Sequence, residues 1–401
     1  MFSSYLCLSG RLKRCISQAR AVLYDLPTAL RREYDYGTGT RRSAILSLTW
    51  RCTSHCQSCT AWRRPAQRDS ELSVSEWLDV AAKLAARGVR SFELFGGDVL
   101  LRKDVLFPLC RAIHAGGGEI HIATNGNLLD EETAELFAQT VYALYLSTDG
   151  LDACHDAIRG TPGTFDRLAQ ARQRLLEARG AGRMPKLICN TTICRDNVLQ
   201  AYDLAAFALK AGYDEIDFEY IGQFEDAHVQ GSAIDGQVPS PIFMRSGPSG
   251  LLPAEQVPLL REQLERAHGL NGKPTVSGRP FHVMTLNIDV LSDHHLVEGA
   301  VPGKRCFVER AMVVIDPYGN IAPCLFFDNI SVGNIRQGAL ERSLETSQRR
   351  RFRERRDSGR LELCRHCIMS VIRNRTGWDV LRRAYIQGGQ PKGENIGPEC
   401  Q

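Results

Sequence analysis

The chain has 401 residues, of which 43% are hydrophobic and 24% are charged, and its formal net charge is +4. This composition is that of an ordinary soluble protein, long enough for one large α/β domain and a smaller one, and the weak charge gives no indication of nucleic-acid binding. The N-terminus lacks the apolar core of a signal peptide, and no apolar run approaches the roughly 18 residues of a membrane-spanning helix. We therefore expect a cytoplasmic protein with reduced thiols, whose 14 cysteines indicate metal chemistry wherever they cluster.

Residues 1–43 are predicted to form a basic, helical N-terminal extension. Residues 1–42 contain eight Lys or Arg and three acidic residues, and apolar residues recur there at roughly helical spacing. We favour a solvated helix that caps the main domain, and the alternative is peripheral contact with an anionic membrane or partner. A second basic run, QRRRFRERR from Gln348, is interpreted as a solvated helix face.

Residues 44–221 repeat one pattern: a short β-branched or apolar run, a turn and an amphipathic helix. Ser73 and Glu76 have the spacing of a capping box, and Gly88, Gly116 and Gly212 stand where helix C-caps are expected. The alternation predicts an α/β fold with a parallel sheet, closed or partly closed into a TIM-type (β/α)6 barrel. The expected strands are 44–49, 91–95, 119–123, 143–147, 186–193 and 215–220, and the expected helices are 73–87, 104–116, 130–139, 163–179 and 197–211.

Residues 222–305 are less regular. A stretch rich in Gly, Pro and Ser predicts a long loop, followed by a helix at 253–268 and a strand-like run at 281–290. Since loops of this length inside a domain are usually functional or disordered, we expect this insert to cover the barrel mouth. From Cys306 to the last residue, 401, the sequence predicts a short hairpin, basic helices and a second cysteine group.

The first cysteine group, Cys52, Cys56 and Cys59, directly follows the first predicted strand. Its spacing lets one loop wrap a cubic 4Fe–4S cluster with three thiolates, whereas zinc would need a fourth ligand, for which His55 is poorly placed. The loop resembles that of the radical S-adenosylmethionine (radical SAM) enzymes. In that family the fourth iron is open and binds the amino and carboxylate groups of S-adenosylmethionine.

Further motifs match that family in order along the barrel. "FELFGGDVLLRKD" stands where the family has a Gly-Gly-Glu motif for the methionine amino group, with Asp98 in place of glutamate. "ATNGNLL", "LYLSTDGLDACHDAIRG" and "CNTTICRDN" resemble the segments of the third, fourth and fifth strands. The cofactor-binding residues that this resemblance implies are Gly96, Gly97, Asp98, Thr124, Asn125, Ser147, Asp149, Thr192 and Asn197.

The second cysteine group comprises Cys306, Cys324, Cys364 and Cys367. Its spacing resembles the C-terminal SPASM or twitch domains, which hold auxiliary iron–sulfur clusters. Because Arg373 stands where a further SPASM cysteine is due, the tail resembles the shorter twitch form, with one 4Fe–4S cluster and four protein ligands. The alternative is a zinc ribbon.

Three residues are candidates for catalysis or substrate contact. Asp217 and Glu219 alternate along the sixth strand and should share one face, so they are predicted to contact substrate if that face lines the barrel. If it does not, they pair with Lys or Arg. Cys194, with Cys189 nearby, is a candidate hydrogen-atom donor.

The resemblance implies generation of a 5′-deoxyadenosyl radical that abstracts a hydrogen atom, with the auxiliary cluster as electron acceptor. We expect oxidation (dehydrogenation) or epimerisation of a small polar or sugar-like biosynthetic intermediate. The alternatives are maturation of a ribosomal peptide and membrane-associated modification of a lipid-linked substrate, while the cosubstrate motifs argue against a non-catalytic iron–sulfur or zinc protein. The implied electron donor is a flavodoxin or ferredoxin.

Overall fold

The computed structural model describes residues 23, 26–38, 40–65, 67–180, 182, 184–245, 247–285, 288–301, 306, 308–338, 340, 346–369 and 377–381. Most of the predicted basic N-terminal helix and Arg373 lie outside the described residues. No helix in the described part is long and apolar enough to cross a membrane.

The described strands form one mixed sheet of ten strands in the order β10-β9-β8-β1-β2-β3-β4-β5-β6-β7. All pairs from β8 through β1 to β7 are parallel, and only β8–β9 and β9–β10 are antiparallel. The predicted parallel α/β core is thus confirmed. The strands are β1 Ser43–Ser47, β2 Ser91–Phe95, β3 Glu119–Thr124, β4 Ala143–Ser147, β5 Lys186–Ile193, β6 Glu215–Tyr220, β7 His282–Met284, β8 Met312–Ile315, β9 Asn320–Ala322 and β10 Gly333–Asn334.

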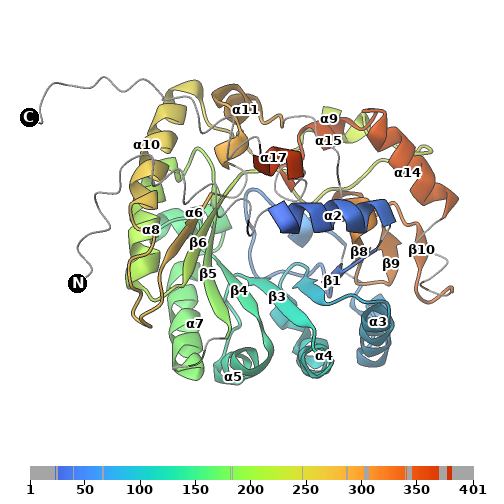
Figure 1. Cartoon of the computed structure of the whole chain (residues 1–401), viewed down its shortest axis with the longest axis horizontal. Coiled ribbons are helices and arrows are strands. Elements are labelled where there is room, and N and C mark those ends of the chain that lie inside the picture. The colour runs from blue at the N-terminus through green and yellow to red at the C-terminus, as the bar shows by residue number, and fades with distance from the viewer. Residues whose placement is uncertain are drawn as a thin grey trace, which may run out of the picture.

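Helices follow the strands of the core as the sequence pattern predicts. Figure 1 shows α3, α4, α5 and α7 arrayed along one side of the sheet, with α8 and α10 beyond β6. The helices are α2 Leu26–Thr38, α3 Val74–Ala86, α4 Lys103–Ala115, α5 Glu131–Thr140, α6 Ala153–Arg159, α7 Thr164–Arg179, α8 Ala201–Lys210, α9 Asp226–Gln230, α10 Val257–His268, α11 Asp293–Glu298, α12 Val308–Ala311, α14 Ser347–Asp357, α15 Glu362–Arg365 and α17 Gly377–Leu381.

Local signals explain where several of these helices begin and end. Ser73 and Glu76 form the predicted capping box at α3. Gly88 and Gly212 have positive φ angles, as expected just past a helix end. At α4 the left-handed residue is Gly117, one position after the expected Gly116, which is the C-cap itself with φ −80°.

One expectation about the second half of the chain was wrong and another was confirmed. The strand-like run at 281–290 forms only the three-residue strand β7, followed by a 3-10 turn at Ile288–Val290. The predicted hairpin after Cys306 is confirmed, since β8 and β9 form an antiparallel pair, and β8 also pairs in parallel with β1 and extends the barrel sheet. The tail and the barrel therefore share one continuous sheet.

The basic run in α14 was also misread as a solvated face. Arg349 is fully buried and Arg356 nearly so. Both lie beside the buried carboxylate of Glu309, which also receives hydrogen bonds of 3.1 and 3.2 Å from Arg353. Three arginines of one helix thus surround one acid. Helical spacing lets arginines three or four residues apart point in the same direction, but the number of charges in the sequence does not show that they are buried.

The two faces of the sheet have different partners. On β6, Ile216, Phe218 and Tyr220 belong to the main hydrophobic core, which also contains apolar residues of α3, α4, α5, α7, α8 and α10. Side chains at alternate positions point to the opposite, inner face. On β1 and β8 the inner positions Ile45 and Val314 belong to a second hydrophobic cluster, which we call the tail core because most of its members come from the tail and the insert.

The insert at 222–305 contacts both the first cysteine loop and the tail. Thr60 donates a backbone hydrogen bond of 2.9 Å to the carbonyl oxygen of Ile242. Phe243 packs against Phe326, with ring centroids 5.0 Å apart. The insert thereby contacts both the loop that follows β1 and the tail, and its covering of the barrel mouth stays a prediction.

The described part of the N-terminal extension is α2. It packs against α17 and α12, and the Glu33 carboxylate accepts a 2.7 Å hydrogen bond from the backbone of Gly377 (Figure 1). The first and last described helices thus lie side by side.

Candidate functional site

The three cysteines of the first group lie in the loop that follows β1. Burial and the neighbouring thiol of Cys56 raise the pKa of Cys52 to about 12 and that of Cys59 to about 11. Backbone amides of Ser54 and Ala61 point at the sulfurs of Cys52 and Cys59, each at 3.4 Å. Close sulfurs that accept N–H donors fit the thiolate ligands of an iron–sulfur cluster.

His55, the other ligand considered for this loop, is not placed with the sulfurs. Its ring is exposed and meets the ring of Trp62 edge-on at 4.8 Å. The loop therefore offers three thiolates, as its spacing predicts.

The Gly96-Gly97-Asp98 segment crosses directly over this loop. Gly97 and Asp98 donate backbone hydrogen bonds of 2.7 and 2.8 Å to the carbonyls of Thr49 and Arg51. A Cβ atom on Gly97 would lie 2.2 Å from the Arg51 carbonyl oxygen, and one on Gly96 would lie 2.3 Å from that of Thr49. The glycines are needed first for this contact between two backbones, a reason that the sequence alone did not supply.

Asp98 is buried and faces the cysteine loop. Its carboxylate accepts hydrogen bonds from the Thr53 hydroxyl (2.6 Å) and the Leu100 amide (3.1 Å). Burial raises the pKa of Asp98 above its usual range. The residue at the glutamate position of the motif is thus tied to the loop between Cys52 and Cys56.

The segment after β3 contacts the same loop. Asn125 donates to the hydroxyls of Thr53 and Ser54 at 3.1 and 3.2 Å, and Asn127 makes the same pair of contacts at 3.2 and 3.1 Å. The Thr124 hydroxyl accepts from the Gly126 amide instead. Thr53, Ser54 and Asn127 were not singled out from the sequence, and their position beside the cysteines and the third-strand motif was the available signal.

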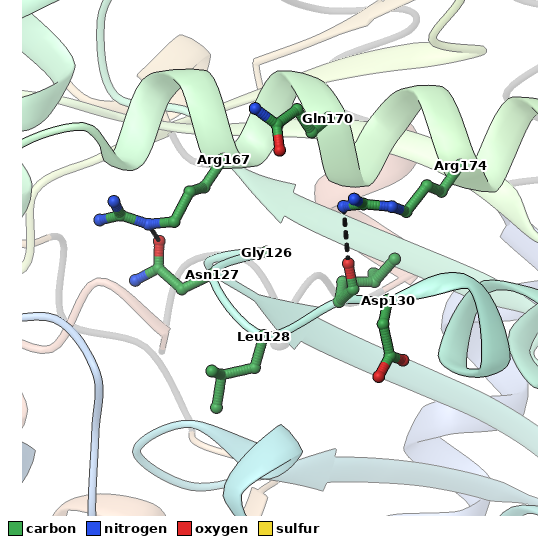
Figure 2. Close-up of a pocket in the computed structure, with 8 residues that line it drawn as sticks. Gly126, Asn127, Leu128, Asp130, Arg167, Gln170 and Arg174 are labelled. Atoms are coloured by element: carbon green, nitrogen blue, oxygen red, sulfur yellow. Dashed lines mark hydrogen bonds between the residues drawn. The ribbon is translucent and has the colours of Figure 1, made fainter.

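A polar cavity of about 310 Å³ lies behind this segment. Figure 2 shows Arg167 and Arg174 of α7 reaching toward it. Arg167 donates to the side-chain oxygen of Asn127 at 3.1 Å, and Arg174 donates to the Leu129 carbonyl at 3.2 Å. These contacts tie the segment after β3 to α7.

Asp149, Thr192 and Asn197 come together at the ends of β4 and β5. The Thr192 amide donates to the Asp149 carboxylate, and the Asn197 side chain donates to the carbonyls of both residues, all at 2.8 Å. Ser147 faces Asn190 across the same strand pair. The fourth- and fifth-strand motifs thus form one connected unit.

Arg159 links that unit to the cysteine loop. It pairs with the buried carboxylate of Asp149 at 2.8 Å, and its guanidinium lies 3.7 Å from the sulfur of Cys56. Arg159 stands inside the fourth-strand motif, but the sequence did not indicate that it reaches a cysteine. His155, one turn earlier, accepts a hydrogen bond from the Asp149 amide at 3.2 Å.

Three thiols of the second cysteine group, those of Cys306, Cys324 and Cys364, lie close enough to interact electrostatically. Burial and the thiol of Cys306 raise the pKa of Cys324 to about 12, and burial with both of those thiols raises the pKa of Cys364. Cys367 is buried in the tail core, against which Cys306, Cys324, Cys364 and Cys59 also pack. One hydrophobic cluster therefore connects the two cysteine groups.

The candidate residues for catalysis or substrate contact lie in two different environments. Asp217 and Glu219 point to the inner face of the sheet, opposite the core residues of β6. Cys194 lies in the main core with 2% of its surface exposed, as does the fully buried Cys189. Cys194 directly follows β5, and its backbone amide donates a 2.9 Å hydrogen bond to the side-chain oxygen of Asn197. Its role as a hydrogen-atom donor stays a prediction.

Comparison with known proteins identifies two regions. The Radical SAM superfamily model matches residues 46–190, and the SPASM model, an iron–sulfur cluster-binding domain, matches residues 306–368. The first match contains Cys52, Cys56 and Cys59, and the second contains all four cysteines of the tail.

Among curated proteins, the chain is 30% identical to the sporulation killing factor maturation protein SkfB of Bacillus subtilis over 179 residues, or 42% of each protein. It is 34% identical to a GTP 3′,8-cyclase of Pseudomonas putida over 180 residues, 44% of this chain and 52% of the cyclase. The matched region spans about half the length of these curated relatives.

Among solved structures, SuiB from Streptococcus suis is similar in fold. Its complex with S-adenosylmethionine gives a TM-score of 0.58 at 16% identity, covering 84% of this chain and 76% of SuiB. The complex of SuiB with the precursor peptide SuiA gives a TM-score of 0.59 at 15% identity, covering 84% of this chain and 74% of SuiB. The likeness extends over the barrel and the tail.

Proposed function

Since the chain is a radical SAM superfamily enzyme with a C-terminal SPASM iron–sulfur domain, we propose that it abstracts a hydrogen atom from a substrate held on the inner face of its sheet. The observation that carries this proposal is the tail core, against which cysteines of both groups pack. A substrate beside it would lie between two redox centres.

Cys52, Cys56 and Cys59 would ligate the cluster that receives S-adenosylmethionine, and Cys306, Cys324, Cys364 and Cys367 the auxiliary 4Fe–4S cluster. When bound, the first cluster and its cosubstrate supply the radical chemistry, and the auxiliary cluster supplies a site for an electron.

The remaining residues of the site position these groups. Asp98 would face the methionine amino group, beside Gly96 and Gly97. Asn125 and Thr124 shape the segment next to the cysteine loop. Arg159, held by Asp149, keeps a positive charge beside the sulfur of Cys56. Ser147, Thr192 and Asn197 complete the wall at the ends of β4 and β5.

We propose a peptide as the substrate class. Support comes from the relatives: SkfB is named as a maturation protein, and SuiB binds a precursor peptide. The reaction on such a peptide would be cross-linking, thioether formation or epimerisation.

A second candidate is oxidation or epimerisation of a small polar or sugar-like molecule. The observation that favours it is the charged inner face of β5 and β6, where Lys186 pairs with Glu215 at 2.7 Å and Asp217 and Glu219 stand nearby. Such a surface suits a compact polar ligand.

A flavodoxin or ferredoxin is the proposed electron donor. We also propose a reducing, cytoplasmic setting, because every cysteine in the described part of the chain is free.

The test is anaerobic reconstitution followed by iron counting and S-adenosylmethionine cleavage. Two 4Fe–4S clusters give about eight irons per chain, and Cys324→Ala with Cys364→Ala should lower this to about four. The reduced protein should release 5′-deoxyadenosine, and Cys56→Ala should not.

To separate the two substrate classes, deuterated peptides and deuterated aminocyclitols are compared for deuterium transfer into 5′-deoxyadenosine. Transfer from a peptide supports maturation, and transfer from the small molecule supports the second candidate. Iron binding without any cosubstrate cleavage under several reductants would contradict the proposed function.

A further inference from the structure

The inner face of β5 and β6 carries three acids and one lysine. Glu215, Asp217 and Glu219 occupy successive inner positions of β6, because Ile216 and Phe218 between them belong to the main core. The lysine is Lys186, at the start of β5, and it pairs with Glu215. Glu215 is therefore the acid of the row whose charge is neutralised within the sheet.

Asp217 is the member of this row that is most deeply buried, with 5% of its surface exposed. Its Oδ1 atom has no hydrogen-bond partner among the described residues. No ion pair of Asp217 occurs among the described residues either, since Lys186 is 2.7 Å from Glu215 instead. A buried carboxylate oxygen without a hydrogen-bond partner is costly, and native proteins rarely keep one without a use for it.

The surroundings of Asp217 repel a second negative charge. Burial, the charge and hydrogen bond of the Glu215 carboxylate and the charge of Glu219 raise the pKa of Asp217 well above its usual range, and the charge of Lys186 opposes this. Asn190, opposite Asp217 on β5, and Met284, opposite it on β7, carry no charge. The missing partner at this position is therefore a cation that can also donate hydrogen bonds.

Asp217 lies close to the residues proposed for the cosubstrate. Ser147, Asn190 and Asp217 form one row across β4, β5 and β6, and Thr192 faces Glu219 one row further toward the strand ends. Neighbouring strands are about 4.8 Å apart, so this row spans roughly 10 Å. Thr192 donates to Asp149, which holds Arg159 beside Cys56.

We propose that Asp217 binds a primary ammonium group of the substrate, with Glu219 as a second acceptor nearer the strand ends. This inference rests on the proposed function, since it assigns the class of substrate that enters that site. A lysine side chain of a peptide and an amino group of a small sugar-like molecule share this chemistry.

The test uses the anaerobically reconstituted holoenzyme and n-butylammonium as the probe, measured by calorimetry without reductant. The wild-type protein should bind n-butylammonium at least about tenfold more tightly than the uncharged 1-butanol, which has the same number of heavy atoms. Asp217→Asn should weaken n-butylammonium binding about tenfold or more. The matched control is Glu135→Gln on the exposed face of α5, which should leave binding unchanged.

Equal binding of the two probes, or undiminished binding by Asp217→Asn, overturns the proposal. If Asp217→Asn does not fold, as judged by its thermal unfolding, Glu219→Gln replaces it, and unchanged n-butylammonium binding by that variant counts against the proposal.

Displacement of bound n-butylammonium by Nα-acetyl-lysine amide supports a peptide as the source of the ammonium group. Displacement of n-butylammonium by glucosamine supports a small molecule as the source. Binding is measured without cosubstrate cleavage. Asp217-dependent binding with no 5′-deoxyadenosine release would therefore contradict only the proposed function.

Discussion

Arg64 and Asp328 form a buried ion pair that joins the two cysteine regions of the chain. Arg64 follows Cys59 by five residues, Asp328 follows Cys324 by four, and both terminal nitrogens of the guanidinium donate to the carboxylate, one of them at 3.1 Å. The guanidinium also stacks over the ring of Trp50, 4.4 Å from its centroid. The relative position of the two cysteine groups thus depends on a bidentate contact, which is geometrically specific.

Arg64→Met should destabilise the protein by about 3 kcal/mol, because it leaves the carboxylate of Asp328 buried without its partner. Replacing both residues, with Arg64→Met and Asp328→Leu, should recover part of this loss. Urea unfolding measures both. The control is Arg351→Ala, whose ion pair with Asp235 is half exposed and should contribute less than about 1 kcal/mol. A loss for Arg64→Met no larger than that of the control would contradict the role assigned to the pair.

Gly97→Ala should lower the iron content of the reconstituted protein to about half, with the auxiliary cluster retained. The added methyl group would lie 2.2 Å from the Arg51 carbonyl oxygen and must push the cysteine loop away. Gly116→Ala is the matched control, since its Cβ would meet nothing nearer than 3.5 Å and its φ is −80°. Full iron loading of Gly97→Ala would show that the loop tolerates the displacement.

His155 should make stability depend on pH. Burial lowers the pKa of His155 from 6.5 to about 3 in the folded protein, so the unfolded chain binds more protons between these values. Stability should therefore fall as the pH is lowered below about 6.5, by up to about 1.4 kcal/mol per pH unit. Thermal or urea unfolding between pH 7.5 and pH 5 measures this slope. His155→Gln should make the slope shallower, and an unchanged slope in the variant would assign the dependence to other groups.

Glu309→Gln should destabilise the protein by about 3 to 5 kcal/mol, because it removes the buried negative charge beside Arg349, Arg353 and Arg356. Glu354→Gln, on the exposed side of the same helix α14, should change stability by less than about 0.5 kcal/mol. Urea unfolding compares the two. Similar effects from both variants would mean that the arginines find other partners when Glu309 is neutral.

The sequence by itself determined the parallel core and the three-thiolate loop. Apolar residues at every second position predict the strands, and apolar residues at helical spacing predict the helices. Both patterns depend only on nearby residues. In a parallel sheet they are enough to place the loop after β1 at the carboxyl ends of the strands. The capping box at Ser73 and the spacing of Cys52, Cys56 and Cys59 likewise involve only residues that are close in the sequence.

Only the tertiary structure decided how these parts meet. That β8 pairs with β1, that Arg159 reaches Cys56, and that Arg64 meets Asp328 all join residues more than 100 positions apart. Such pairings depend on how whole helices and strands pack together, and no periodic pattern in the sequence indicates them. The same holds for Asp217: alternation on β6 predicts its place on the inner face, but only the tertiary structure pairs Lys186 with Glu215 and leaves Oδ1 of Asp217 without a hydrogen-bond partner among the described residues.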